Sequence, residues 1–408
     1  MQLKEFSLIN LQLEASLVFQ AIKTVIEPEM IEEALEKTNS FESRQRKLTS
    51  SLVVCLVIAM SYWSSDSMTT VLKNLVNGLS KQWTKLGQSW KTPVSSSISE
   101  ARQRLGCQVM SQLFNSIVKP LANSETPGAF LGGLRVMAVD GTLLDVPDSQ
   151  ANAKVFGYPG SRKGTKAGFP KVRMVLLIET GTHLITDALM CPYRIGERVR
   201  ALKLLRSVNK SMLLMWDRGF HSYQMLNSTL AHGCQYLGRV PSNVKFPYHQ
   251  ILDDGSYLSW INPDRKSKKK GKTKILVRVI EYSIETDGEL KTYRLITSLM
   301  DLALFPALLL AEQYHQRWEI ENTIDELKTH LLGRKTPIRS LKPREVVQEI
   351  YGWLLGHYAI RSLMFQASEQ GNISPLRLGF TGTLKVIRRA IPDFQDLEER
   401  QVPFFSHG

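Results

Sequence analysis

The chain has 408 residues, 43% of them hydrophobic and 22% charged, a composition that excludes a disordered protein and allows two or three domains. Its formal net charge of +14 favours a polyanionic partner, either nucleic acid or a membrane surface. The longest apolar run, residues 51–63, is too short to span a bilayer and no basic amphipathic anchor is present, so we expect nucleic acid and no membrane.

The four cysteines, Cys55, Cys107, Cys191 and Cys234, are scattered along the chain without a Cys-x-x-Cys pair. This spacing excludes a zinc knuckle and a disulfide framework. The first residues also lack the basic, apolar and small-residue order of a signal peptide. We therefore expect a cytoplasmic protein of bacterial type.

Residues 1–125 have helical periodicity and few strand signals, and the run 51–63 is typical of a buried helix. Ser97 and Glu100 have the spacing of a capping box, and Gly106 lies where the short helix that they begin would stop.

A second helical run follows Gly106, so the segment resembles a helix-turn-helix. In that case Arg102 and Arg104, on the first of these short helices, are candidate DNA contacts. A plain helical hairpin with exposed arginines explains the same pattern, and both interpretations stay open at this point.

The pattern changes near residue 126 to short apolar, β-branched runs that alternate with helical ones. The predicted order is three strands, a helix, a strand, a helix and a strand, at 134–147, 171–180, 183–191, 196–208, 211–220, 222–233 and 234–241. Strands and helices in this order indicate a mixed sheet with helices packed on it, an α/β fold.

Residues 242–299 are rich in turn and strand signals and contain the run RKSKKKGKTK at 265–274, in which seven of ten residues are basic. This run, which includes Lys268, Lys269 and Lys270, is either a solvated charged turn or a contact with the DNA backbone. Beyond residue 300 the chain is helical again, with a long amphipathic helix at 344–365.

Three acidic residues stand out by their positions. Asp140 lies in the first predicted strand where its apolar part gives way to polar residues, Asp217 ends the apolar strand LLMW, and Glu321 lies on a late helix. Carboxylates that share a cleft repel one another unless a cation lies between them, and hard oxygen ligands suit Mg²⁺ or Mn²⁺. Two such ions support phosphoryl transfer, so a basic protein with this cleft is expected to act on phosphodiesters.

The late helix carries a polar stripe beside its apolar face. At about 100° per residue, Tyr314, Arg317, Glu321 and Lys328 fall within one narrow sector. A neighbouring sector holds the apolar side chains of Ile320, Ile324, Leu327 and Leu331. The stripe is therefore either the edge of a half-buried cleft or a surface where Arg317 and Glu321 form an i, i+4 ion pair.

These residues resemble a known family. Tyr314-x2-Arg317-x3-Glu321-x6-Lys328 is similar to the Y-R-E-K signature of the insertion-sequence-four group of bacterial DDE transposases. The segments VMAVDGTLLDVPDS and LLMWDRGF resemble the two aspartate motifs of the same enzymes, and the three acidic residues are separated by 77 and 104 residues.

The resemblance implies a ribonuclease H-like mixed sheet core with a β-rich insertion, flanked by helical N- and C-terminal regions. The corresponding divisions are a DNA-binding region at 1–125, a catalytic core at 126–241 and 300–340, the insertion at 242–299 and a C-terminal region at 341–408.

The resemblance also implies an activity: metal-dependent cleavage of insertion-sequence ends, a hairpin intermediate and strand transfer into target DNA by a homodimer on double-stranded DNA. By the same resemblance, Asp140, Asp217 and Glu321 would bind two Mg²⁺ or Mn²⁺ ions, and Tyr314, Arg317 and Lys328 would contact phosphates. Tyr293 stands where relatives can carry a tryptophan that stacks on a flipped base, although a packed strand aromatic explains it equally well.

Two other functions share these features. One is a DNA-binding derivative that no longer cuts, and the other is a repair or recombination nuclease with the same core, because a fold does not determine its substrate.

Overall fold

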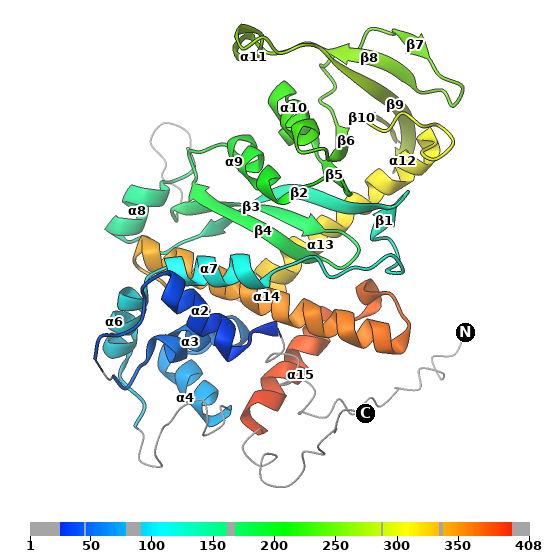
Figure 1. Cartoon of the computed structure of the whole chain (residues 1–408). Coiled ribbons are helices and arrows are strands. Elements are labelled where there is room, and N and C mark those ends of the chain that lie inside the picture. Colours follow the sequence, from blue (N-terminus) through cyan, green and yellow to red (C-terminus); the bar gives the residue numbers. More distant parts are fainter. Residues whose placement is uncertain are drawn as a thin grey trace.

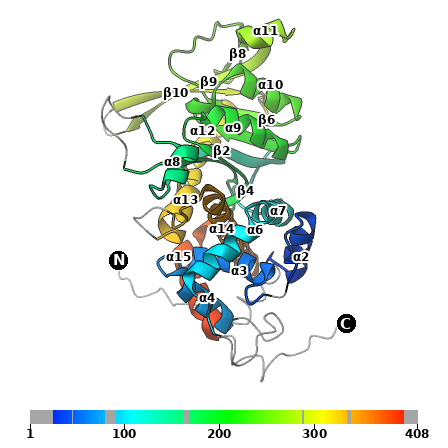
Figure 2. The ribbon, with the colours of Figure 1, turned by 90° about the vertical axis from the view of Figure 1, so that its left-hand side faces the viewer.

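The structure, a computed structural model, describes residues 25–44, 46–78, 91–160, 168–286, 289–333 and 338–393. One mixed sheet occupies one half of the molecule and a helical layer occupies the other (Figure 1). Both halves contain segments from distant parts of the chain, and Figure 2 shows the same division from the side.

The sheet has the strand order β4-β3-β2-β5-β6-β10-β9-β8-β7, with β1 paired to β2. Its strands are β1 (Phe130–Leu131), β2 (Leu134–Asp145), β3 (Lys171–Glu179), β4 (Leu184–Pro192), β5 (Met212–Trp216), β6 (Gln235–Arg239), β7 (Gln250–Ile251), β8 (Tyr257–Ile261), β9 (Ile275–Thr286) and β10 (Glu289–Thr297). The β2–β5 and β5–β6 pairs are parallel and the other pairs are antiparallel. The expected mixed α/β sheet is therefore confirmed, and the insertion continues this sheet because β10 pairs with β6.

The two faces of the sheet are buried against different helices, as the alternation of side chains along a strand requires. Met137 and Val139 of β2 pack with α9 (Glu197–Leu204) and α10 (Tyr223–Ala231). Val136 and Ala138 of the same strand belong to the larger core on the opposite face, which includes the late helices. Even-numbered residues of this part of β2 therefore face the larger core, and odd-numbered residues face α9 and α10.

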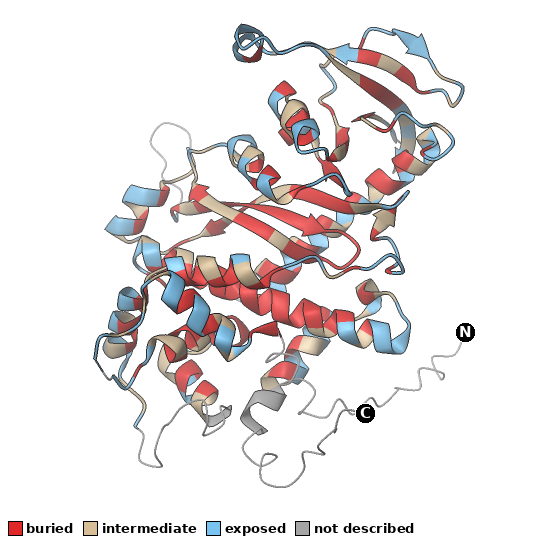
Figure 3. Cartoon of the chain, in the orientation of Figure 1, coloured by how far each residue is buried: buried red, intermediate tan, exposed pale blue. Residues whose placement is uncertain are grey.

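The long helix α14 (Pro343–Gly371) lies directly against the sheet and packs with the other helices of the helical layer (Figures 1 and 2). Those helices are α2 (Pro28–Lys37), α3 (Ser50–Tyr62), α4 (Met68–Gly78), α6 (Ser95–Leu105), α7 (Gln108–Ile117) and α15 (Phe380–Asp393). The sequence predicts an amphipathic helix, but most residues of α14 are buried (Figure 3), because it is covered from both sides.

Close contact between α3 and α14 depends on glycine. A Cβ atom on Gly352 would lie 2.5 Å from the backbone oxygen of Val57, and one on Gly356 would lie 2.1 Å from Oγ of Ser61. Both distances are shorter than any real contact, so only glycine allows the two helices this separation. The buried helix predicted at 51–63 is confirmed as α3, with the side chain of Thr49 accepting a hydrogen bond from the N–H of Leu52.

The late helix is not regular. It consists of α12 (Ala307–His315), a 3₁₀ turn (Gln316–Trp318), α13 (Glu319–Asp325) and a π-helical turn (Glu326–Leu331). The uniform rotation used to align its polar stripe therefore does not hold over the whole length, because the angle per residue differs between these helix types.

Two local predictions differ from the structure and one agrees with it. The helix α6 begins at Ser95, so Ser97 and Glu100 lie inside it and form no capping box. Gly106 does end the helix, with φ of 73°. The basic run 265–274 contains a short helix, α11 (Arg265–Lys269), at the tip of the insertion, because the Asp264 side chain caps it by accepting from the N–H of Ser267 at 2.8 Å.

None of the helices in the described ranges combines the length and the apolar run that crossing a bilayer requires.

Candidate active site

The register of β2 against β5 places Asp140 and Asp217 side by side. The last pair of this parallel ladder is Val139 with Trp216, so the two aspartates are the next residue on each strand. The strand β2 continues to Asp145 against β3, so Asp140 lies inside a strand, within the predicted strand 134–147. The strand β5 stops at Trp216, while β2 continues beside it. We call this end of β5, with Asp140 and Asp217, the notch.

Both aspartates follow residues that alternate between the two faces. Leu213 and Met215 of β5 belong to the core beneath the late helix, as Val136 and Ala138 of β2 do. By the same alternation, Asp140 and Asp217 are directed to that face. The register and the parity together bring the two carboxylates to one point of the sheet.

The surroundings of Asp140 oppose its negative charge. Burial raises the pKa of Asp140 to about 6. Two effects lower this pKa in part: the N–H of Gly141, which donates to Oδ1 at 2.7 Å, and the positive charge of Arg317. Repulsion from Glu197 and Asp217 adds to the rise in the pKa. A carboxylate with a raised pKa in a cleft is typical of a functional site.

Arg317 links Asp140 to the third predicted carboxylate. Its guanidinium lies 3.7 Å from Oδ2 of Asp140 and 3.8 Å from Oε1 of Glu321. Arg317 is buried, whereas the Glu321 side chain is 48% exposed. Of the two alternatives that the sequence leaves open, the i, i+4 ion pair is therefore present, and its arginine also reaches Asp140.

Tyr314 stabilises the notch from beneath. Its side chain is 4% exposed, and its hydroxyl donates to the backbone oxygen of Trp216, the last residue of β5, at 3.5 Å. The direct contact with a DNA phosphate expected for Tyr314 is therefore wrong for this arrangement, because the ring is covered by the core. Its contact instead restrains the strand end that carries Asp217.

The donor set at the notch fits a hard divalent cation. The Oδ1 atom of Asp217 is buried without a hydrogen-bond partner, which leaves a carboxylate oxygen to be satisfied by another group. Within the described part of the chain, no three acidic, histidine or cysteine side chains are close enough together to hold an ion as they stand. The Arg317 side chain lies between Asp140 and Glu321 instead.

Glu197 is a residue near the notch that the sequence predictions missed. Its Oε2 lies 2.6 Å from the place of a Cβ on Gly141, next to Asp140, and its charge acts on Asp140. Its only signal in the sequence is an acidic residue at the start of a predicted helix, which is common at surfaces because it complements the helix dipole.

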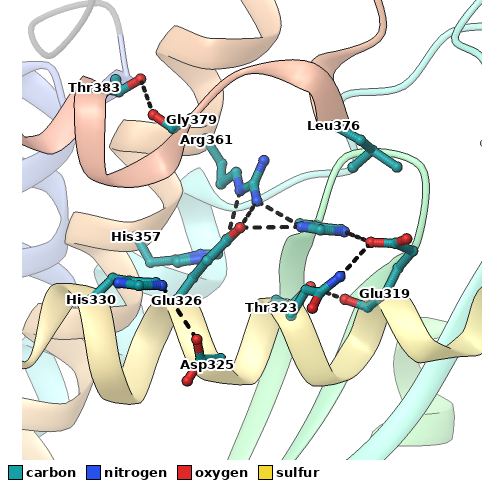
Figure 4. A network of polar contacts seen from close by, with 12 residues as sticks. Glu319, Thr323, Asp325, Glu326, His330, His357, Arg361, Leu376, Gly379 and Thr383 are labelled. Atoms are coloured by element: carbon teal, nitrogen blue, oxygen red, sulfur yellow. Dashed lines mark hydrogen bonds and ion pairs between the residues drawn. The ribbon is translucent and has the colours of Figure 1, made fainter.

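A buried polar network holds the helix that carries Glu321 (Figure 4). Glu326 pairs with Arg361 and lies 3.2 Å from Nδ1 of His183 and 3.3 Å from Nε2 of His357. The Nε2 atom of His183 lies 2.8 Å from Oε2 of Glu319. One network therefore joins α13 and the π-helical turn to α14 and to the turn between β3 and β4.

Tyr293 is packed between neighbours on both adjacent strands. The Tyr282 ring on β9 stacks on it with centroids 5.4 Å apart, and the Arg239 guanidinium on β6 lies 4.4 Å from its centroid. His315 contacts the same ring from α12. The packed aromatic is thus the arrangement found, and stacking on a base would require one of these neighbours to move.

Arg102 does not face DNA. It is 2% exposed, with Nε donating to Gln348 at 2.8 Å and Nη2 donating to Ser340 and to the backbone oxygen of Glu345. The predicted DNA contact is therefore wrong, because these bonds commit its guanidinium to joining α6 and α14. Arg104, two residues further on, is exposed.

The remaining candidates lie apart from the notch. The side chains of Lys268, Lys269 and Lys270 are exposed on and just after α11. Lys328 is half-buried in the π-helical turn, seven residues after Glu321. The structure brings together Asp140, Asp217, Arg317 and Glu321, and leaves the lysines as separate candidates for phosphate contact.

A mixed sheet with two strand aspartates side by side, linked through Arg317 to a glutamate on the late helix, is the arrangement expected of a DDE transposase. The family described as "Transposase DDE domain" matches residues 131–357, and "Insertion element 4 transposase N-terminal" matches residues 17–115. The chain belongs to the insertion-sequence-four family of DDE transposases.

Particular relatives agree with this assignment. The chain is 26% identical over 384 residues to "Transposase InsG for insertion sequence element IS4" of Escherichia coli K12, covering 93% of this chain and 84% of the relative. It is 24% identical over 215 residues to "Putative transposase InsZ" of the same organism, covering 52% of this chain and 68% of the relative.

A solved structure shares the fold. It is the cryo-EM structure of the piggyBac transposase synaptic complex with hairpin DNA, with a TM-score of 0.50 and 11% identity over 95% of this chain and 82% of that chain. The expected ribonuclease H-like core is consistent with this likeness, and the transposase function follows from the family.

Proposed function

We propose that this transposase cleaves the ends of an insertion sequence in a divalent-ion-dependent reaction and joins them to target DNA. The observation that carries the proposal is the register that brings Asp140 and Asp217 together opposite Arg317 and Glu321. One such site can serve end cleavage, hairpin formation and strand transfer, because each is a phosphoryl transfer on DNA.

Asp140, Asp217 and Glu321 are the residues that would hold two Mg²⁺ or Mn²⁺ ions. When bound, such a pair activates the attacking oxygen and stabilises the leaving oxygen of a phosphodiester. Arg317 offsets the charge of Asp140 and Glu321, and in this proposal Arg317, once the site opens to DNA, and Lys328 contact a phosphate beside the cut. Tyr314 positions the end of β5.

The DNA contacts follow from the charge of the molecule. The net charge of +14 supports binding to double-stranded DNA, and the exposed lysines of α11 together with Arg104 offer backbone contacts. We propose a homodimer that pairs two transposon ends and works in the bacterial cytoplasm at the nucleoid, where such DNA lies.

The test of the site replaces each carboxylate separately. Asp140→Ala, Asp217→Ala and Glu321→Ala are expected to abolish Mg²⁺-dependent cleavage of an end fragment while leaving its binding largely intact. Cleavage is followed on a labelled fragment and binding on the same fragment by gel shift. Glu32→Ala, at an exposed carboxylate on α2, is the matched control and should cut like the wild type. Full cleavage by any of the three variants would refute the assignment.

The products separate transposition from the other two functions. Strand transfer into a second DNA molecule indicates a transposase that completes the reaction. Hydrolysis without joining indicates a nuclease with the same core, and binding without any nick indicates a derivative that no longer cuts.

A further inference from the structure

Glu197 reaches the notch from the face of the sheet opposite to Glu321. It is the first residue of α9, whose Ala201 and Leu204 pack in the core with Met137 and Val139 of β2. The late helix instead packs on the other core, through residues such as Ile320 and Leu327. The two acidic residues therefore belong to helices on opposite sides of the strand ends.

The Glu197 carboxylate lies against two glycines. Its Oε2 lies 2.6 Å from the position that a Cβ on Gly141 would take, so a side chain there would require the Glu197 carboxylate to move. Its Oε1 lies 3.4 Å from the corresponding position on Gly219. Gly141 follows Asp140 and Gly219 follows Asp217 by two residues, so one carboxylate lies against both aspartate segments.

The Arg173 side chain on β3, the strand next to β2, forms an ion pair with Glu197 and orients its carboxylate. The Nη1 atom of Arg173 on β3 lies 3.2 Å from Oε2 of Glu197. The Glu197 side chain is 35% exposed, so its carboxylate is accessible from solvent as well as held.

We propose that Glu197 is a fourth acidic residue of the divalent-ion site, acting from the α9 face of the notch beside Asp140 and Asp217. This inference rests on the proposed function, since it assumes that the two aspartates bind ions. Its chemical basis is that hard divalent ions take several oxygen ligands, both directly and through groups that orient the ligands.

Ion binding is the measurement that tests this role. Mn²⁺ is titrated into the full-length protein by calorimetry, and Glu197→Gln, which removes the charge and keeps the shape, is expected to weaken Mn²⁺ affinity about tenfold. Glu32→Gln on α2 is the matched control and should bind like the wild type. Thermal unfolding of each variant shows whether the fold is retained.

A second variant covers the case in which Glu197→Gln does not fold. Gly141→Ala keeps every charge and places a methyl group where the Glu197 carboxylate lies, so it should also weaken Mn²⁺ affinity. Unchanged affinity in a folded Glu197→Gln protein, or in folded Gly141→Ala if the former does not fold, would overturn the inference.

The same titration separates this failure from failure of the proposed function. Asp140→Asn and Asp217→Asn are expected to lose more affinity than Glu197→Gln. Wild-type affinity in both asparagine variants would refute the ion site itself and the inference with it. Loss of affinity in both, with wild-type affinity in Glu197→Gln, would refute only the role of Glu197.

Discussion

Asp140 is held in surroundings that disfavour its charged form. Its side chain is 23% exposed, and burial with the nearby carboxylates Glu197 and Asp217 raises its pKa from 3.8 to about 6. A folded-state pKa above the unfolded value means that the ionised group lowers stability at neutral pH, and that protonation relieves the effect as the pH falls. A site built to receive cations is expected to have this property.

Asp140→Asn should therefore stabilise the protein. The variant is expected to gain about 2 kcal/mol in the free energy of unfolding near neutral pH, since asparagine carries no charge and can still accept from the N–H of Gly141. The gain should shrink as the pH falls through about 6 and vanish below 3.8, where the wild-type aspartic acid is neutral in both states. Urea unfolding over this pH range measures the difference.

The control for this experiment is an exposed carboxylate elsewhere on the surface. Asp253→Asn, in the turn between β7 and β8, is expected to change the free energy of unfolding by less than about 0.5 kcal/mol. A loss of stability in Asp140→Asn near neutral pH would contradict the electrostatic explanation.

At the scale of elements, the helix that carries Glu321 is fixed by buried charge. Burial alone would raise the pKa of Glu326, but hydrogen bonds with His183 and His357 and the charge of Arg361 outweigh it, so this pKa lies well below its ordinary value. A lowered folded-state pKa means that the ionised group stabilises the fold above the unfolded value of 4.5, and that this contribution is lost as the pH falls.

Glu326→Gln is expected to cost about 3 kcal/mol of stability near neutral pH, because it leaves Arg361 buried without its counter-charge. The wild type should lose stability as the pH falls below 4.5, and the variant should lose less over the same range. Thermal unfolding at several pH values tests both statements.

An exposed pair supplies the comparison for Glu326. Glu33 and Lys37 form an i, i+4 ion pair on the surface of α2, and Glu33→Gln should cost less than about 0.5 kcal/mol. Equal losses in the two variants would show that the Glu326 network does not hold the helix.

In the molecule as a whole, the sheet connects the notch to the exposed lysines Lys268, Lys269 and Lys270 on and just after α11. The strands β6, β10, β9 and β8 run without interruption from the core to the insertion that carries α11 (Figure 1). Because the insertion shares this sheet, a phosphate contact at α11 would orient DNA relative to the notch. Such contacts release counterions, and their number sets the salt dependence of binding.

Replacing Lys268, Lys269 and Lys270 together by alanine is expected to weaken binding of an end fragment for all sequences alike. The slope of log affinity against log salt should fall by up to about 3, roughly one for each lost phosphate contact. Fluorescence anisotropy at several salt concentrations gives the slope. The three lysine-to-arginine changes keep the charge and should keep the slope, and an unchanged slope in the alanine variant would show that α11 is only a solvated turn.

The sequence alone predicted the order of β2 to β6 with α9 and α10, without the short helix α8 (Gln150–Phe156), and it pointed to three candidate carboxylates. These features are local: strands and helices follow from the period of apolar residues, and Asp140, Asp217 and Glu321 each stand out against their immediate neighbours or in a short spaced motif. The family resemblance rests on the same short motifs, and for that reason the family assignment was available before the fold.

Only the tertiary structure decided which of these residues meet and which are buried. The pairing of Val139 with Trp216, the burial of Arg102 under α14 and the approach of Glu197 to Gly141 each join residues that are far apart in the chain. No local period specifies such contacts, because they depend on strand register and on which helix covers which face of the sheet.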